Sequence, residues 1–210
     1  MLPYLINKFL IFLVSFTVVL EPGSGDQEKD LAMDITSKLK ENLNRKGINV
    51  VMVKHGDGSS SQVDIANTVN QSKGDIFISL HFNACISNQA SGFEIFYNHS
   101  AEGFNKVPLN WELVQSKYYK NSKALANMVL FGLENEFNEK IDVNLNMINR
   151  ATTEANLLPL KGIAMPAVLV ELGFLTNELE AIKIKDPIWQ DKTVNALSKV
   201  ILNYRQKYEK

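Results

Sequence analysis

A run of apolar residues that ends on a carboxylate is the feature that most constrains this chain. Pro166 and Ala167 lead into Val-Leu-Val, and Glu171 follows directly. Such unbroken runs are typical of strands buried on both faces, which occur in parallel sheets covered by helices. An unpaired charge in such a place costs several kcal/mol. We therefore expect Glu171 to have a partner and a chemical use.

Strands and amphipathic helices alternate along the rest of the chain. Recurring apolar residues predict the long helices, and capping residues indicate the short helices that begin near Ser60 and Asn177. The predicted helices cover residues 30–46, 60–69, 125–137, 177–180 and 194–204. The predicted strands cover residues 48–53, 75–80, 92–97 and 168–171. This alternation predicts an α/β fold with a single, mostly parallel sheet that helices cover on both faces.

Length and composition narrow the class of protein. A chain of 210 residues fits one domain. Its 22 basic and 23 acidic side chains nearly cancel, and no cluster of Lys and Arg is present to meet a phosphate backbone, so we expect no nucleic acid partner. Cys85 is the only cysteine, which excludes an internal disulfide and any multi-cysteine metal site.

The N-terminal residues allow two interpretations. Residues 9–20 form an apolar run, and small residues follow at 23–25, as in an export signal. The alternative is that residues 16–20, which are rich in β-branched side chains, are the first buried strand. We therefore divide the chain into an apolar segment at residues 1–15, a candidate export signal that overlaps this strand on one interpretation, and one domain at residues 16–210.

Polar side chains follow two of the predicted strands directly. His81 comes after Leu80, and Glu171 comes after Val170. Parallel α/β sheets place their chemistry beyond the carboxyl ends of the strands. We therefore expect both side chains at one edge of the sheet. Residues 99–121 show no clean period and are predicted to be an excursion over the surface.

Three motifs together resemble those of a known family. Asp26-Gln-Glu-Lys-Asp30 opens the first helix, Ser79-Leu-His-Phe-Asn-Ala84 ends a strand, and residues 166–177 end another with the tail Gly173-Phe-Leu-Thr-Asn177, the most specific part. In these motifs the chain resembles the zinc-dependent N-acetylmuramoyl-L-alanine amidases of bacterial cell-wall turnover. The resemblance covers about residue 16 to the C-terminus, and it implies a six-stranded α/β sheet.

The resemblance also implies the residues of a site. The family binds zinc through a histidine, a glutamate and a second histidine; here Glu28 matches the ligand glutamate and His81 the second histidine. Glu171 matches the catalytic glutamate. The resemblance implies that zinc polarises the amide between the lactyl group of N-acetylmuramic acid and L-alanine and activates a water, whose proton Glu171 passes to the departing amine. We expect Asn83 either to position substrate or to be a turn residue that bonds its own backbone.

The first ligand histidine of the family is absent from this chain. The family's first strand ends in Asp-Pro-Gly-His-Gly-Gly, whereas this chain has Glu21-Pro-Gly-Ser-Gly-Asp26, with Ser24 at the histidine position. Only three residues separate Ser24 from Glu28, so most of the loop between the two ligands is missing. Catalytic zinc normally has three protein ligands, and a hydroxyl is a poor substitute for imidazole. The sequence thus predicts a degenerate first ligand motif.

Three other residues are weighed as replacement zinc donors. His55 follows the strand at 48–53, His99 follows the strand at 92–97, and Cys85 lies four residues beyond His81. For the two histidines the alternative is an exposed loop position. For the cysteine it is a small buried apolar residue.

Three functions are compatible with these residues. The first is a zinc-dependent, secreted peptidoglycan hydrolase of the cell envelope, periplasmic or extracellular, that cleaves the amide between N-acetylmuramic acid and L-alanine. The second is a catalytically impaired homologue that binds peptidoglycan or a regulatory protein partner. The third is an unrelated hydrolase with Cys85 as nucleophile and His81 as base, for which no orienting carboxylate is evident. In some family members an insertion near residues 99–121 carries a helix that plugs the zinc site, and Trp111-Glu-Leu-Val114 would be a short version.

Overall fold

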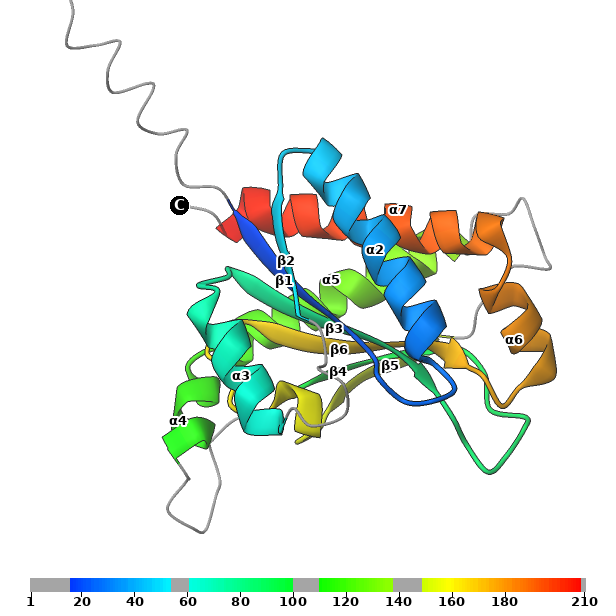
Figure 1. The fold of residues 1–210 in the computed structure, drawn as a ribbon, viewed down its shortest axis with the longest axis horizontal. Helices are drawn as coiled ribbons and strands as arrows, with labels where there is room; N and C mark the ends of the chain where they lie inside the picture. Colours follow the sequence, from blue (N-terminus) through cyan, green and yellow to red (C-terminus); the bar gives the residue numbers. More distant parts are fainter. Residues whose placement is uncertain (1–15, 54–60, 100–109, 138–148, 209–210) are drawn as a thin grey trace, which may run out of the picture.

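The computed structural model describes residues 16–53, 61–99, 110–137 and 149–208. In these residues six strands form one sheet in the order β2-β1-β3-β6-β4-β5 (Figure 1). The strands are β1 (Thr17–Pro22), β2 (Asn49–Met52), β3 (Ile76–Asn83), β4 (Phe93–Tyr97), β5 (Asn149–Glu154) and β6 (Ala167–Phe174). The helices are α2 (Lys29–Arg45), α3 (Gln62–Gln71), α4 (Asn110–Ser116), α5 (Tyr119–Phe137), the 3-10 helix η3 (Leu158–Leu160), α6 (Glu178–Ile184) and α7 (Pro187–Tyr208).

Strand direction brings several chain segments to one edge of the sheet. β1, β2, β3 and β6 run parallel, whereas β4 pairs antiparallel with β6 and β5 pairs parallel with β4. The carboxyl ends of β1, β3 and β6 therefore share an edge with the first residues of β4 and β5. We call this the polar edge. The predicted single α/β domain with a mostly parallel, six-stranded sheet is confirmed.

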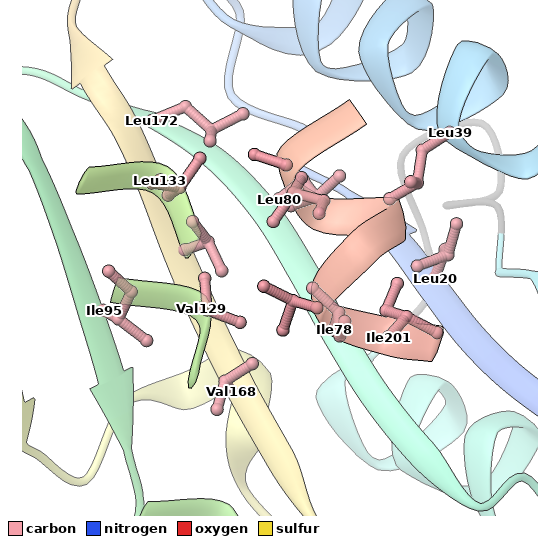
Figure 2. Close-up of a cluster of buried hydrophobic side chains, with 14 of the residues drawn as sticks. Leu20, Leu39, Ile78, Leu80, Ile95, Val129, Leu133, Val168, Leu172 and Ile201 are labelled. Carbon is pink, nitrogen blue, oxygen red and sulfur yellow. The ribbon is translucent and has the colours of Figure 1, made fainter. Parts of the chain in front are cut away.

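Helices cover both faces of the sheet and form two apolar cores. On one face α2, α5 and α7 pack on the strands, and Figure 2 shows Leu39 of α2, Leu133 of α5 and Ile201 of α7 in one cluster with side chains of the strands. On the other face α3 and η3 cover a smaller cluster that includes Val19, Phe77 and Leu169. A fully buried aliphatic side chain stabilises the fold by about 2 kcal/mol. The two cores therefore stabilise the sheet whose strand ends form the polar edge.

Residues 99–121 differ from the sequence expectation where the structure describes them. Residues 110–121 contain all of α4 and the first three residues of α5. A helix as short as α4 shows too few apolar repeats for a clear period. Gln115 of α4 donates a hydrogen bond to the Leu160 carbonyl, at the end of the sheet opposite the polar edge. This anchor gives no support for α4 as a plug over the polar edge.

Two further expectations concern the ends of elements and the N-terminus. Phe16 and β1 are buried in the sheet, as expected for the first strand, and residues 1–15 lie outside the described residues. None of the described helices is long and apolar enough to cross a membrane. β5 is a strand that the sequence pattern did not reveal, because five of its six residues are polar and all six are at least partly exposed.

Candidate functional site

His81 and Glu171 lie side by side at the polar edge. β3 and β6 pair in parallel with His81 directly opposite Glu171. Opposed residues on neighbouring strands point to the same face of a sheet. Two residues earlier on β6, Leu169 belongs to the core under α3 and η3, so both side chains lie on that face. The expectation that one edge brings His81 and Glu171 together is confirmed.

Glu28 reaches this pair from the start of α2. It occupies the N-cap position of the helix. Its Oε2 accepts a 2.7 Å hydrogen bond from the Phe82 N–H, and its Oε1 accepts one of 3.2 Å from the Gly25 N–H and lies 3.1 Å from His81 Nδ1. An ionised carboxylate can only accept, so Nδ1 of His81 carries a proton. The other ring nitrogen, Nε2, is buried and has no hydrogen-bond partner among the described residues.

The turn after β1 presses against the same two side chains. The Gly23 N–H donates a 2.7 Å hydrogen bond to the Leu80 carbonyl, which ties the turn to β3. A Cβ at position 23 would lie 2.5 Å from Glu28 Oε2 and 2.7 Å from His81 Nδ1. Real Cβ atoms do not approach so closely, so glycine is required here for close approach.

Glu171 keeps an uncompensated oxygen. Its Oε2 is buried and receives no hydrogen bond from the described residues. Burial raises the pKa of Glu171 to about 7; the positive charge on His81 lowers it, and the carboxylates of Glu28 and Glu94 raise it. A carboxyl group with a pKa near neutrality can both take and give a proton.

Electrostatic coupling favours the charged forms of His81 and Glu28. Burial by itself lowers the pKa of His81, but its bond to Glu28 and the charges of neighbouring carboxylates raise the pKa overall. Burial likewise opposes ionisation of Glu28, yet the bonds from His81, Phe82 and Gly25 lower its pKa. The pair is therefore stabilised in its charged form.

Two functional candidates at this edge were missed from the sequence. Glu94 of β4 lies directly opposite Glu171. Glu94 Oε1 accepts a 2.8 Å hydrogen bond from Thr153 Oγ1, and its Oε2 lies 3.7 Å from Arg150 Nε. In the sequence, Glu94 was marked only by its position in the predicted strand at residues 92–97. Arg150 lies on β5, a strand that was not predicted. Neither could be placed beside Glu171 without the order of the strands.

The donors at this edge do not fit a three-ligand zinc site. Both oxygens of Glu28 already accept backbone hydrogen bonds, and Gly23 fills the space beside Glu28 and His81. Ser24 is exposed. Among the residues that the structure describes, no group of three His, Cys, Asp or Glu side chains could hold a metal ion. His81 and Glu28 remain two donors where catalytic zinc normally has three.

The other candidate zinc ligands supply no third donor beside Glu28 and His81 among the described residues. His99 follows β4, which ends at the opposite side of the sheet, and its Nδ1 lies 3.1 Å from Glu154 Oε1. Cys85 is exposed in the loop after β3, rather than a small buried residue. His55 lies outside the described residues. Asn83 is the last residue of β3, half-buried on the same face as His81, so its role in binding substrate stays a prediction.

Comparison with curated proteins identifies relatives. A family model described as N-acetylmuramoyl-L-alanine amidase matches residues 20–203. The chain is 27% identical to the N-acetylmuramoyl-L-alanine amidase LytC of Bacillus subtilis, over 91% of this chain and 36% of LytC. It is 25% identical to the germination-specific N-acetylmuramoyl-L-alanine amidase of the same organism, over 89% of this chain and 78% of that protein. The chain thus spans about a third of LytC's length.

Solved structures give the same relationship. An N-acetylmuramoyl-L-alanine amidase from Clostridium difficile 630 superposes with a TM-score of 0.73 and 28% identity, over 92% of this chain and 98% of that chain. The CwlD amidase from Clostridioides difficile, solved in complex with the GerS lipoprotein, superposes with a TM-score of 0.69 at 21% identity, over 92% and 100%, and shows the fold alone. Because the family model matches nearly the whole domain, the chain belongs to the N-acetylmuramoyl-L-alanine amidase family.

Proposed function

We propose that this chain cleaves the amide bond between N-acetylmuramic acid and the L-alanine of the stem peptide in peptidoglycan, and that it acts in the cell envelope. The observation that carries the proposal is the buried carboxyl group of Glu171, with a pKa of about 7, opposite His81 at the polar edge. The family membership and the cell-wall relatives support the same bond as substrate.

Glu171 is the proton carrier of the proposed reaction. Its carboxylate takes a proton from the attacking water and passes the proton to the departing amine of L-alanine. Burial and the neighbouring Glu94 keep its proton affinity high enough for the second step. Asn83, on the same face of β3 as His81, is assigned to hold the substrate backbone.

Glu28 and His81 are assigned as the zinc ligands that this chain retains. Zinc is the cofactor that the family implies. With two donors in place of three, we expect an affinity well below that of a complete catalytic site. The proton chemistry above therefore uses only side chains of this chain.

Release of peptide from purified sacculi tests the proposal. Wild type, Glu171→Gln and Cys85→Ser would be incubated with sacculi across a series of zinc concentrations, and soluble stem peptides would be identified by mass. We expect release by wild type and by Cys85→Ser, and none by Glu171→Gln. Loss of release on changing Cys85 alone would favour the cysteine hydrolase instead.

A second function is favoured by one specific observation. The oxygens of Glu28 are engaged by backbone N–H groups, and Ser24 stands exposed at the position of the first ligand. Such a site is suited to a homologue that binds peptidoglycan, or a regulatory protein partner, without hydrolysis. The CwlD relative was solved in complex with a lipoprotein, which gives a precedent for a protein partner in this fold. Co-sedimentation with sacculi without peptide release at any zinc concentration would select this function.

A further inference from the structure

Arg150 lies at the polar edge, and most of the N–H donors of its guanidinium make no hydrogen bond to a described residue. It is the second residue of β5, and its side chain is 40% exposed. Its one ion pair among the described residues is a long contact of 3.7 Å from Nε to Glu94 Oε2. No described residue accepts a hydrogen bond from its two terminal amino groups. A guanidinium presents five N–H donors in a planar fork that matches a carboxylate.

An irregularity in β5 turns Arg150 toward the site. Phe93 pairs with Asn149 and Ile95 with Thr152, so Arg150 and Ala151 together oppose the single residue Glu94. This is a β-bulge, which re-aims side chains and is frequent beside active sites. Without it, Arg150 and Thr153 would point to opposite faces of the strand, yet both contact Glu94.

The bulge is maintained at a cost in backbone strain. Ala151 has a φ of 84°, a left-handed conformation that non-glycine residues rarely adopt. The Ala151 N–H donates a 2.8 Å hydrogen bond to Asn149 Oδ1, which holds the turn in place. Strained residues of this kind persist where the surrounding structure uses them, and they cluster at ligand sites.

The guanidinium lies over an aromatic ring. Arg150 Cζ lies 5.1 Å from the centroid of Phe174, three residues beyond Glu171. A bulge in β6 allows this contact, because Asn83 pairs with Phe174 although His81 pairs with Glu171. Contact with this buried ring restrains where the guanidinium lies before any ligand arrives.

Arg150 is a cation among the carboxyl groups of the polar edge. Glu28, Glu94 and Glu171 bring three carboxyl groups to the polar edge, and an anionic substrate group needs a cation to approach them. Among the ion pairs that the described residues form, only the pair of Arg150 with Glu94 brings an arginine to these carboxylates. Arg150 can therefore offset, at one defined position, the repulsion between these carboxyl groups and an anionic group of the substrate.

Distance along the sheet selects a position in the substrate. The Arg150 guanidinium reaches back over β4 to Phe174 of β6, which lies two to three residues of strand, or about 7 to 10 Å, beyond Glu171. Two residues of extended peptide span about 7 Å, and a side chain covers the remainder. The lactyl carboxyl group is consumed in the amide bond that is cut, so carboxylates remain on the peptide side. The second residue of the stem peptide, a D-glutamate, carries one within reach.

We propose that Arg150 binds the free α-carboxylate of this second residue and makes the site selective for stem peptides in which that carboxylate is not amidated. The inference rests on the proposed function, since it names the substrate group that the same site recognises. Arg150 is a specificity-determining residue in this account, and Ala151 and Phe174 are positioning residues for it.

Two matched substrates test the inference. They are N-acetylmuramoyl-L-Ala-γ-D-Glu-L-Lys and the same compound with a carboxamide in place of the D-glutamate α-carboxylate. Values of kcat and KM would be measured for wild type, Arg150→Gln, Arg150→Lys and Arg45→Gln. Arg45 is an exposed arginine at the far end of α2 and serves as the control. Binding of both substrates to Glu171→Gln, with and without Arg150→Gln, would be measured by calorimetry.

We expect wild type and Arg45→Gln to prefer the free carboxylate by roughly ten- to hundred-fold, mainly through KM. Arg150→Gln should act equally on both substrates, and Arg150→Lys should retain a reduced preference because its charge lacks the planar fork. If Arg150 had a purely structural role, Arg150→Gln would lower kcat/KM for both substrates alike and leave the ratio of the two kcat/KM values unchanged.

The outcomes separate this inference from the proposed function. Equal cleavage of both substrates by wild type, or a preference that survives in Arg150→Gln, overturns the role of Arg150 while the amidase activity stands. If wild type cleaves neither substrate and Glu171→Gln binds neither, the proposed function fails and the inference fails with it.

Discussion

His81 and Glu171 face each other across β3 and β6, yet only His81 has a hydrogen-bonded carboxylate beside it among the described residues. The ring of His81 lies 3.1 Å from Glu28 Oε1, whereas no described residue donates to Glu171 Oε2. Leaving a buried carboxyl oxygen without a partner destabilises a fold. Families keep such groups where chemistry needs a shifted proton affinity. The relationship therefore makes stability and proposed activity oppose each other at Glu171.

The pH dependence of stability should reveal this opposition. Folded Glu171 has a pKa of about 7, above the value of about 4.3 in an unfolded chain. Between these values the folded state binds more protons, so stability falls as pH rises through this window and stays reduced above it. In metal-free buffer at pH 8, Glu171→Gln should therefore unfold at a higher temperature than wild type. The expected gain in the free energy of unfolding is up to about 3 kcal/mol.

Thermal unfolding followed by circular dichroism at pH 5 and pH 8 checks this expectation. Glu41→Gln, an exposed position on α2, is the control and should show no difference that depends on pH. The gain at Glu171→Gln should be small at pH 5. An equal gain at both pH values, or a loss at pH 8, would contradict the burial cost assigned to Glu171.

Gly23→Ala should disrupt the pair of Glu28 and His81. The added methyl group would approach both side chains within 2.7 Å, and neither can move without breaking hydrogen bonds to the backbone or to the other. We expect a loss of about 1 to 3 kcal/mol in the free energy of unfolding, and a loss of activity. Ser24→Ala, at the exposed next position, should stay within about 0.5 kcal/mol of wild type in urea titrations. Equal stability of the two variants would argue against the close packing at Gly23.

Zinc content should be low and sensitive to donors. After exhaustive dialysis, elemental analysis of wild type should find well below one zinc per chain, since two donors are retained. His81→Ala should lower the content further, and Ser24→His should raise it by adding an imidazole at the family position. A full equivalent of zinc in dialysed wild type would mean that a third donor exists.

Glu180→Gln should loosen the strand end that carries Glu171. The Glu180 carboxylate accepts hydrogen bonds of 2.7 Å from the N–H groups of both Gly92 and Phe174. A carboxamide offers one oxygen, so one buried N–H loses its acceptor, at about 1 to 3 kcal/mol. Glu178→Gln, exposed on the same helix, is the matched control for urea denaturation. Similar midpoints for the two variants would refute this anchoring role.

Much of the fold was readable from local patterns. Sequence spacing is enough to predict α2 and α5 from their four-residue apolar repeats, and β2, β3 and β6 from their apolar runs. Each of these patterns lies within a single helix or strand. β5 escaped because its polar residues lie at the edge of the sheet, where no apolar pattern is needed. The reversed direction of β4 and β5 depends on long connections that leave no local signal.

The site was only partly predictable for the same reason. His81 and Glu171 follow apolar strands directly, which marks them in sequence. Glu94 and Arg150 matter only because β4 and β5 are next in the sheet after β6. The turn at Gly23 was predicted as a shortened loop, but its contact with Glu28 and His81 required the three-dimensional packing.

Identification of the bond that is cut tests the central claim most directly. Wild type and Glu171→Gln would be incubated with N-acetylmuramoyl-L-Ala-γ-D-Glu-L-Lys in added zinc, and new amino groups would be labelled and identified. The account predicts a free amino terminus on L-alanine with wild type and none with Glu171→Gln. No alanine amino terminus with wild type, or equal amounts with both proteins, would contradict it.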